Sequence, residues 1–162
     1  MSDVKVKDIE TLLSAHPFFK DLDHAQIKFL AGCGKNLHFH KDEIIFHEGR
    51  EANYFFVICQ GKVVLEINGA QRGAIMIQTV DEGHILGWSW LIPPHKWNFT
   101  ARALEETSTI ILDGACLRKK CQEDHALGYE LFKRFSTVLA KRLENTIIQL
   151  LDVYGVPVTQ RK

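Results

Sequence analysis

The chain has 162 residues, which is enough for one domain with a full hydrophobic core. Lys and Arg together number 20, as do Asp and Glu, so the formal net charge is zero with neutral histidines. This balance argues against a domain that coats a nucleic acid backbone, because such domains carry a basic excess. The sequence also lacks an apolar run of the ~20 residues that a membrane helix needs, and its charged N-terminus is unlike a signal peptide. We therefore expect a cytoplasmic protein with no membrane contact and no direct DNA binding.

Two short helices are predicted at the N-terminus. Residues 4–14 have apolar side chains at helical spacing, and the segment before Pro17 ends that pattern. A second helix is predicted to begin after Asp23, because Gln26 stands three residues later and completes a capping box. Gly32 is expected to end it.

The middle of the chain predicts a series of short strands separated by turns. The segment 62–67 alternates between two faces, which is typical of a strand with one buried face, and Asn68-Gly69 predicts a hairpin turn. The other strands are predicted from their β-branched and aromatic residues, over residues 43–46, 54–58, 74–80, 100–104 and 107–112. Many short strands with frequent turns indicate a mainly β domain: a sandwich, a jelly roll or a small barrel.

The C-terminal part predicts two further helices. Asp113 can cap a short helix that extends to Cys121, and Asp124 can cap a long helix over about residues 125–154. The long helix would extend ~45 Å, which is more than a small barrel can cover, so we expect a partner helix on its free side. The residues predicted at that dimer surface are Phe135, Leu139, Leu143, Ile147, Leu150 and Tyr154.

The domain organisation follows from these elements. Residues 1–124 are expected to form the β domain with its flanking helices. Residues 125–155 add the long helix to the same domain, and residues 156–162 form a short tail.

The four cysteines are predicted to be free thiols that pack as small apolar side chains. No CxxC pair occurs, and disulfides are rare in the reducing compartment that we expect. The residues concerned are Cys33, Cys59, Cys116 and Cys121.

The order of the elements and several motifs resemble the cyclic nucleotide-binding domain of catabolite-activator-type proteins. Residues 41–49 resemble the family pattern Gly-Glu-x-Ile-Phe-x-x-Gly, with Asp42 in place of the first glycine. Further matches are the opening at residues 16–19, the hairpin at 55–63, the glycines Gly83 and Gly87, and the strand at 100–104. The resemblance covers about residues 14–154. It implies an eight-stranded double-stranded β-helix, or jelly roll, followed by a dimerisation helix. We expect this chain to lack the helix-turn-helix module that follows in the regulators.

The resemblance also implies where a ligand would bind. In nucleotide-binding members, a Glu after the second glycine accepts from the ribose hydroxyl, and an Arg about ten residues later holds the cyclic phosphate with backbone amides. Here Trp88 and Trp97 stand at those positions, and an indole cannot pair with a phosphate. We therefore expect a degenerate phosphate motif and a ligand other than cAMP, with no cofactor. The candidate ligand-binding residues are Gly87, Trp88, Ser89, Trp90, Lys96, Trp97 and Asn98.

The leading hypothesis is a non-enzymatic small-molecule sensor or adaptor that acts as a homodimer and signals to a protein partner. Its tryptophans either form the walls of an open pocket or fill the old cavity as core, and the sequence leaves both open. A second hypothesis stays within the same family: a cyclic nucleotide still binds, through the amides of Gly87 and Ser89 and through Lys96.

The third and fourth hypotheses belong to different classes of protein. His38, His40, Glu43 and His47 resemble part of the metal motif of cupins, which would imply a metal-dependent enzyme. The fourth hypothesis is an interaction module that binds no ligand, with the tryptophans only as core.

Overall fold

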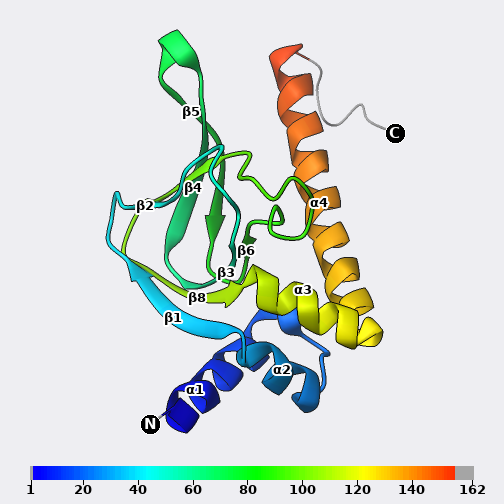
Figure 1. Cartoon of the computed structure of the whole chain (residues 1–162). Helices are drawn as coiled ribbons and strands as arrows, with labels where there is room; N and C mark the ends of the chain where they lie inside the picture. Colours follow the sequence, from blue (N-terminus) through cyan, green and yellow to red (C-terminus); the bar gives the residue numbers. More distant parts are fainter. Residues whose placement is uncertain (1, 156–162) are drawn as a thin grey trace. The chain divides into compact units, whose positions relative to one another are not determined.

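Eight strands form two antiparallel four-stranded sheets in the computed structural model, which describes residues 2–155, with side chains from residue 8 (Figure 1). Sheet A has the order β1 (Gly34–Phe39), β8 (Thr107–Asp113), β3 (Tyr54–Gln60) and β6 (Ile85–Leu86). Sheet B has the order β2 (Ile44–Phe46), β7 (Thr100–Ala103), β4 (Lys62–Asn68) and β5 (Ala74–Asp81). The predicted fold class, a mainly β jelly roll with flanking helices and a long C-terminal helix, is confirmed.

The helices begin at the predicted capping residues. Asp23 Oδ1 accepts from Gln26 N–H at 2.8 Å, and Gln26 Oε1 accepts from Asp23 N–H at 3.1 Å, so the capping box is confirmed. Asp124 Oδ1 likewise accepts from Leu127 N–H at 3.1 Å. The helices are α1 (Ser2–Ala15), α2 (His24–Ala31), α3 (Gly114–Glu123) and α4 (His125–Val153), with short 3-10 turns η1 (Pro17–Phe19) and η2 (Ala70–Arg72).

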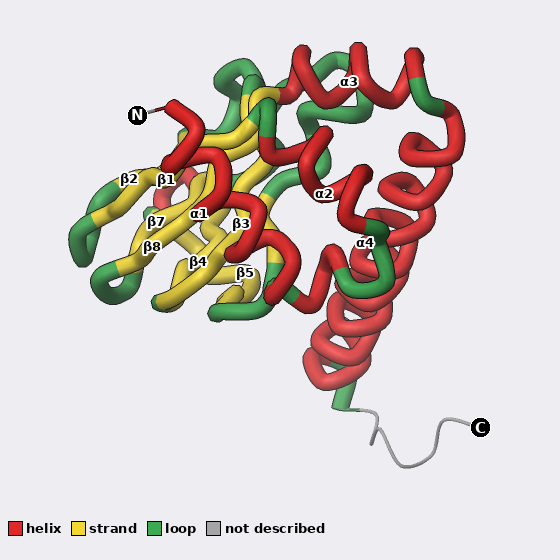
Figure 2. The backbone as a smooth tube through the Cα atoms, turned by 90° about the horizontal axis from the view of Figure 1, so that it is seen from below, coloured by secondary structure: helices red, strands yellow, loops and turns green. Residues whose placement is uncertain are grey.

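The chain forms two compact units, one over residues 1–123 and one that begins at Asp124 and contains α4. Within the first unit, α1 and α2 lie side by side and both contact β1 (Figure 2). Among the described helices, α4 included, none combines the length and apolar content that a bilayer crossing requires.

The core of the first unit is apolar and draws side chains from both sheets. Its principal cluster consists of Phe39, Phe46, Ala52, Phe56, Ile58, Val63, Leu65, Val80, Leu86, Trp97, Ala101, Ala103 and Ile111. Phe46, Phe56 and Trp97 lie in ring contact with one another, so aromatic packing connects both sheets to the loop before β7.

Strand β4 differs from its prediction. We expected one buried face, but residues 63–66 are all buried, including Val64 and Glu66. The physical reason is position: β4 lies between β5 and β7, and Arg102, the cross-strand partner of Val64, extends to Glu66. The hairpin after β4 is also longer than the predicted two-residue turn, because η2 inserts a 3-10 turn before Gly73.

The cysteine prediction is wrong for two of the four residues. Cys33 and Cys116 form a disulfide with a Cα–Cα distance of 5.8 Å, across a sequence separation of 83 residues. The β1–β8 pairing brings them together, because Gly34 lies opposite Leu112 and Cys33 O accepts from Asp113 N–H at 2.9 Å. Cys59 and Cys121 are thiols outside any disulfide, as predicted.

Candidate functional site

The loop between β6 and β7 begins at Gly87, which is buried and has a φ of +86°. A Cβ atom at this position would lie 2.5 Å from Cζ3 and 2.7 Å from Cη2 of Trp97. Glycine is therefore required at this position for two reasons: the backbone is left-handed, and any side chain would collide with the indole.

The second half of the loop is held by backbone hydrogen bonds to residues 49–52. Trp97 N–H donates to Arg50 O at 2.9 Å, and Trp97 O accepts from Gly49 N–H at 2.8 Å. Ala52 N–H donates to His95 O at 2.7 Å. The position of Trp97 is thus fixed by its own main chain as well as by its side-chain packing.

The indole of Trp97 is part of the core. It is 5% exposed and stacks on Phe46 with ring centroids 3.8 Å apart and an interplanar angle of 13°. Phe56 lies 6.1 Å away on a tilted plane. Two aromatic neighbours at these distances enclose the ring, which leaves little of it for a ligand.

Trp90 is buried as well. Its exposed fraction is 0%, and its ring stacks at 5.9 Å on Phe55. Arg118 Nη1 donates to the Trp90 carbonyl oxygen, a contact that the sequence did not indicate. A Cβ added at Gly114 would lie 3.1 Å from Trp90 Cβ, so helix α3 begins in close contact with this residue.

Three of the remaining candidate residues lie nearer the surface, and the fourth, Ser89, does not. Trp88 is half-buried and meets Phe99 edge to face at 6.0 Å, while Lys96 and Asn98 are exposed. Ser89 is buried. The structure therefore divides the seven residues into a buried set and an outer rim. The buried set is Gly87, Ser89, Trp90 and Trp97, and the rim is Trp88, Lys96 and Asn98.

The guanidinium nearest this loop in sequence, on β7, already binds carboxylates. Glu66 Oε1 accepts from Arg102 Nε at 3.1 Å and from Nη2 at 2.5 Å, and Asp42 Oδ1 accepts from Nη1 at 3.2 Å. The hydrogen bond to Glu66 raises the pKa of Arg102 above its ordinary value. Because two carboxylates occupy its donors, Arg102 does not present an open fork to a phosphate.

A model of the cyclic nucleotide-binding domain matches residues 36–124 of the sequence, which is more than half of the chain. The chain belongs to this family. The match assigns the chain to the cyclic nucleotide-binding type of domain.

Solved structures agree with this assignment. A candidate cyclic nucleotide-binding protein from Geobacter metallireducens is 27% identical, with a TM-score of 0.74 over 83% of this chain and 97% of that one. A cyclic nucleotide-binding domain from Methylobacillus flagellatus has the same fold (TM-score 0.77, 19% identity, 93% of this chain and 85% of that one). So does the sensor domain of the transcriptional regulator DNR from Pseudomonas aeruginosa (TM-score 0.65, 19% identity, 82% and 94%). A search of curated proteins finds no match.

One departure from the family pattern has a direct structural explanation. Asp42 replaces the first glycine of the Gly-Glu-x-Ile-Phe pattern and has a φ of +72°. That left-handed conformation favours glycine, but aspartate tolerates it better than most residues. The substitution therefore keeps the turn before β2 and adds a carboxylate that reaches Arg102.

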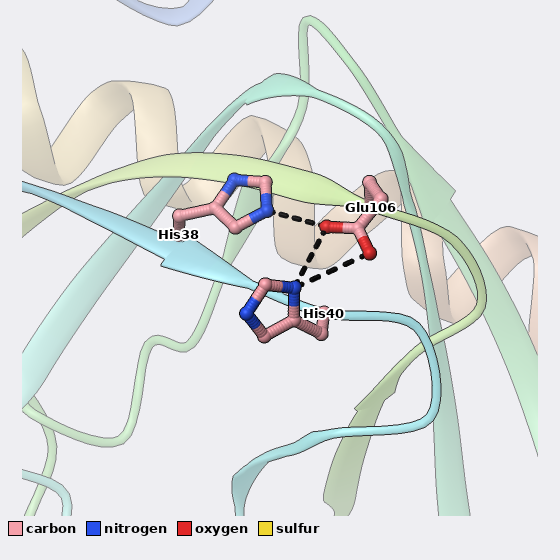
Figure 3. Close-up of side chains that lie close together, drawn as sticks. All are labelled: His38, His40 and Glu106. Atoms are coloured by element: carbon pink, nitrogen blue, oxygen red, sulfur yellow. Dashed lines mark hydrogen bonds and ion pairs between the residues drawn. The ribbon is translucent and has the colours of Figure 1, made fainter.

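A second group of polar side chains lies outside this loop, at the end of β1. His38 and His40 come together there with Glu106, which precedes β8 (Figure 3). Glu43 and His47, which the cupin-like motif grouped with these histidines, are not part of any such cluster in the described part of the chain. The hydrogen bond from His38 is the main cause that lowers the pKa of Glu106.

Sequence reasoning missed Glu106 because its position depends on strand register. Phe39 pairs with Thr107 and His38 with Ser108, so one further step along the ladder brings His40 opposite Glu106. That relation becomes visible only once β1, which we did not predict as a strand, is paired with β8.

Helix α4 carries five of the six predicted dimer residues, and the sixth, Tyr154, is its C-cap residue. Leu143, Leu150 and Tyr154 are 61%, 54% and 74% exposed. Leu139 and Ile147 are half-buried, whereas Phe135 is buried in the single chain. Three residues outside the predicted set, Tyr129, Phe132 and Val153, are also exposed large apolar side chains of this helix.

Proposed function

We propose that this chain is a non-catalytic regulatory domain in which the indole of Trp97 occupies the site of the cyclic phosphate, so that cAMP and cGMP are not its ligands. One observation carries the proposal. The Trp97 ring lies so close to Gly87, the glycine that opens the family's phosphate loop, that a single added carbon would be 2.5 Å from it.

The energetic argument concerns what a nucleotide would have to displace. Removing a buried Trp side chain from a core costs about 3–5 kcal/mol. If a cyclic nucleotide had to expel Trp97, that cost would be subtracted from its binding free energy. The affinity would fall by roughly two to three and a half orders of magnitude, at 1.4 kcal/mol for each factor of ten.

The chemistry of the neighbouring groups also disfavours the binding of a cyclic phosphate. A cyclic phosphate needs fixed N–H donors and a guanidinium or comparable cation. The Trp97 indole supplies no charge, and the Arg102 guanidinium is bound to Glu66 and Asp42. Lys96 is exposed and offers a point charge without the fork geometry of arginine.

The rim of the loop is the proposed entry for a different ligand. Trp88 is half-buried, Ile92 is 43% exposed, and Lys96 and Asn98 lie at the surface. An indole face and an exposed aliphatic side chain on the same loop suit a flat apolar molecule, with the lysine and the amide available to a polar substituent.

The proposed output is a homodimer formed through α4. Leu143, Leu150 and Tyr154 follow one another at steps of seven and four residues, so they share one helix face, and all three are exposed. A paired helix would remove these apolar side chains from water and would connect two regulatory domains to one protein partner.

The test is thermal unfolding with cAMP and cGMP at millimolar concentration. A ligand at 100 times its Kd adds ~2.7 kcal/mol, which for a chain of this size raises Tm by roughly 5–10 °C. We expect a change below about 1 °C for either nucleotide. A rise of several degrees that disappears in a Lys96→Ala variant would refute the proposal and would favour nucleotide binding through Lys96 and the loop amides.

The rim needs its own measurement. A panel of flat aromatic compounds, screened by the same thermal assay, should contain molecules that stabilise the wild type but not a Trp88→Ala variant. Asn36→Ala provides a control variant on the exposed part of β1, remote in sequence from the rim. If stabilising compounds act equally on the Trp88→Ala variant, the rim is not their binding site.

A further inference from the structure

His38, His40 and Glu106 form a compact group whose ligating atoms all lie within 4.8 Å of one another. His38 Nε2 is 2.5 Å from Glu106 Oε2, and His40 Nδ1 is 3.1 Å from Oε2 and 3.3 Å from Oε1 of the same carboxylate (Figure 3). The two imidazole rings meet edge to face, with centroids 5.3 Å apart. Both histidines therefore converge on one carboxylate.

The backbone places these side chains on one face of sheet A. Phe39 and Thr107 pair with each other and are buried, so their neighbours on both sides point the other way. His38 and His40 are two residues apart along the strand direction, which corresponds to about 6–7 Å, and cross-strand neighbours lie about 5 Å apart. This geometry holds the group together without a long or mobile loop.

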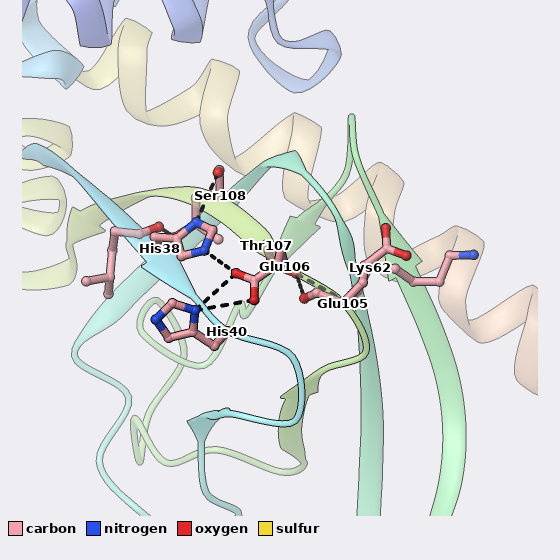
Figure 4. A network of polar contacts seen from close by, with 9 residues as sticks. His38, His40, Lys62, Glu105, Glu106, Thr107 and Ser108 are labelled. Carbon is pink, nitrogen blue, oxygen red and sulfur yellow. Dashed lines mark hydrogen bonds and ion pairs between the residues drawn. The ribbon is translucent and has the colours of Figure 1, made fainter.

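A further contact orients one of the imidazoles. His38 Nδ1 lies 3.4 Å from Ser108 Oγ, its cross-strand neighbour (Figure 4). When the Nδ1 proton is shared with this hydroxyl, the lone pair of Nε2 points toward Glu106. Metal-binding histidines commonly have such a partner on the second nitrogen, because it fixes both the tautomer and the ring orientation.

The turn that carries Glu106 is itself held in place. Thr107 Oγ1 donates to Glu105 O at 2.9 Å and lies 3.4 Å from Lys62 O, so the start of β8 is tied to the start of β4 (Figure 4). Glu106 therefore approaches the histidines from a constrained backbone.

We propose that His38, His40 and Glu106 bind a divalent transition-metal ion of the Zn²⁺ type. Zinc binds imidazole nitrogen at about 2.0–2.1 Å and carboxylate oxygen at about 2.0–2.2 Å. It usually has four ligands, arranged as a tetrahedron. Neighbouring ligand atoms are then about 3.4 Å apart by simple geometry. The His40–Glu106 separations of 3.1 and 3.3 Å are close to this value, whereas His38 and Glu106, at 2.5 Å, would have to move apart by about 0.9 Å to admit the ion. Two imidazoles and one carboxylate complete three positions and leave the fourth to water.

The donor set also sets the selectivity of the site. Imidazole nitrogen suits zinc, copper, nickel and iron, whereas Mg²⁺ and Ca²⁺ prefer oxygen ligands throughout. The side chains of His38, Glu106 and His40 are 48%, 60% and 72% exposed, so an ion can enter from solvent without any opening of the fold. A bound ion would link β1, the edge strand of sheet A, to the turn before β8.

A simple ion-pair cluster explains the arrangement less well. Exposed ion pairs contribute little to stability and are screened by salt, so stability alone gives little reason for three converging side chains. The proposed site also lies on sheet A, whereas Trp97 precedes β7 of sheet B. It therefore stands independently of the function proposed for the loop at residues 87–99.

The experiment is calorimetric titration of the metal-free full chain with ZnCl₂, in a buffer that does not bind metal. We expect one ion per chain with a Kd in the micromolar range, and no binding of Mg²⁺ or Ca²⁺. His38→Ala and Glu106→Gln should each raise the Kd at least tenfold. His47→Ala is the matched control, because His47 is also exposed but lies outside the group, and its Kd should equal that of the wild type.

Two further measurements separate this site from other metal ligands. Co²⁺ in place of Zn²⁺ should give visible d–d absorption bands without the intense near-ultraviolet band of a thiolate ligand, which excludes Cys59 and Cys121 as the ligands. Ser108→Ala should raise the Kd a few-fold while circular dichroism stays unchanged. The proposal is overturned if no saturable binding occurs below 1 mM Zn²⁺, or if binding survives in the His38→Ala/His40→Ala double variant.

Discussion

Replacement of Trp97 by alanine tests whether this indole is core or the wall of a pocket. The side chain is 5% exposed and stacks on Phe46 at 3.8 Å. A buried aromatic ring hides about 150–250 Å² of surface, and at about 25 cal/mol per Å² this amounts to roughly 4–6 kcal/mol. Measured Phe and Trp to alanine substitutions in cores cost about 3–5 kcal/mol. We therefore expect Trp97→Ala to lower the free energy of unfolding by about 4 kcal/mol.

The assay is urea unfolding followed by circular dichroism, together with a thermal scan. For a chain of this length, each kcal/mol changes Tm by about 2–4 °C, so the expected decrease is about 8–16 °C. Trp88→Ala is the matched control, because Trp88 belongs to the same loop but is only half-buried, where it meets Phe99 edge to face. We expect a loss of about 1 kcal/mol for this control. A Trp97→Ala loss below 1 kcal/mol would refute the assignment of Trp97 to the core.

A double-mutant cycle with Gly87 sharpens this result. In the wild type, Gly87→Ala introduces both a clash with the Trp97 ring and a side chain at a φ of +86°. In the Trp97→Ala background the clash is gone and only the backbone strain remains, at about 1–2 kcal/mol. The two substitutions should therefore be coupled by at least about 1 kcal/mol. Additive losses would mean that the indole does not occupy the space above the glycine.

Other consequences concern the rest of the chain. Burial lowers the pKa of His16, whose Nδ1 accepts from Phe18 N–H, so the unfolded chain binds the proton more readily. Stability should then fall as the pH decreases through about 6.5, and urea unfolding at pH 7.5 and 5.5 should show a smaller difference in a His16→Asn variant. Reduction of the Cys33–Cys116 disulfide should cost about 2–4 kcal/mol, seen as a lower Tm in dithiothreitol than in oxidised protein, and a Cys33→Ser variant should not respond. Leu143→Lys should convert a dimer to a monomer in analytical ultracentrifugation, and an unchanged dimer would exclude this face of α4 as the interface.

Local chemistry explains what the sequence predicted well. The capping box of Asp23 and Gln26 and the cap at Asp124 involve residues three apart in sequence, so no tertiary information is needed to recognise them. The long apolar repeat of α4 and the β-branched residues of the strands are also local patterns, so they too can be recognised without tertiary information. The family motifs then indicated an eight-stranded jelly roll, whereas the order of the strands in the two sheets comes from the structure.

The features that escaped prediction depend on strand pairing. Strand β1 has no clear apolar alternation, because it lies at the edge of sheet A and only its last residue, Phe39, is buried. Without β1, neither the Cys33–Cys116 disulfide nor the approach of Glu106 to His40 can be inferred. Both contacts join residues more than 60 positions apart, which local patterns do not reveal.

The tryptophan loop was ambiguous for a different reason. An aromatic pocket and an aromatic core use the same residue types, so composition does not separate them. The burial of Trp90 and Trp97, against the partial exposure of Trp88, is a property of the folded loop alone. It assigns two of the rings to packing and leaves one at the rim.

Trp97 stands where nucleotide-binding members of the family have an arginine, and this replacement affects how the domain can respond to a signal. A phosphate cradle without its ligand holds N–H donors in a poorly solvated site, and each buried donor without a partner costs roughly 1–3 kcal/mol. An indole accepts no hydrogen bond and cannot satisfy such donors, so the N–H groups here bond to backbone carbonyls instead, as those of Trp97, Gly49 and Ala52 do, while the ring fills the space by apolar packing. A ligand can shift a conformational equilibrium only by the difference between its affinities for the two states, so a permanently filled cradle offers no such difference. A regulatory role for this chain then needs an input elsewhere. The rim at Trp88 and the His38–His40–Glu106 group are two places where binding can favour one state, and titrations of the same protein with flat aromatic compounds and with zinc distinguish them.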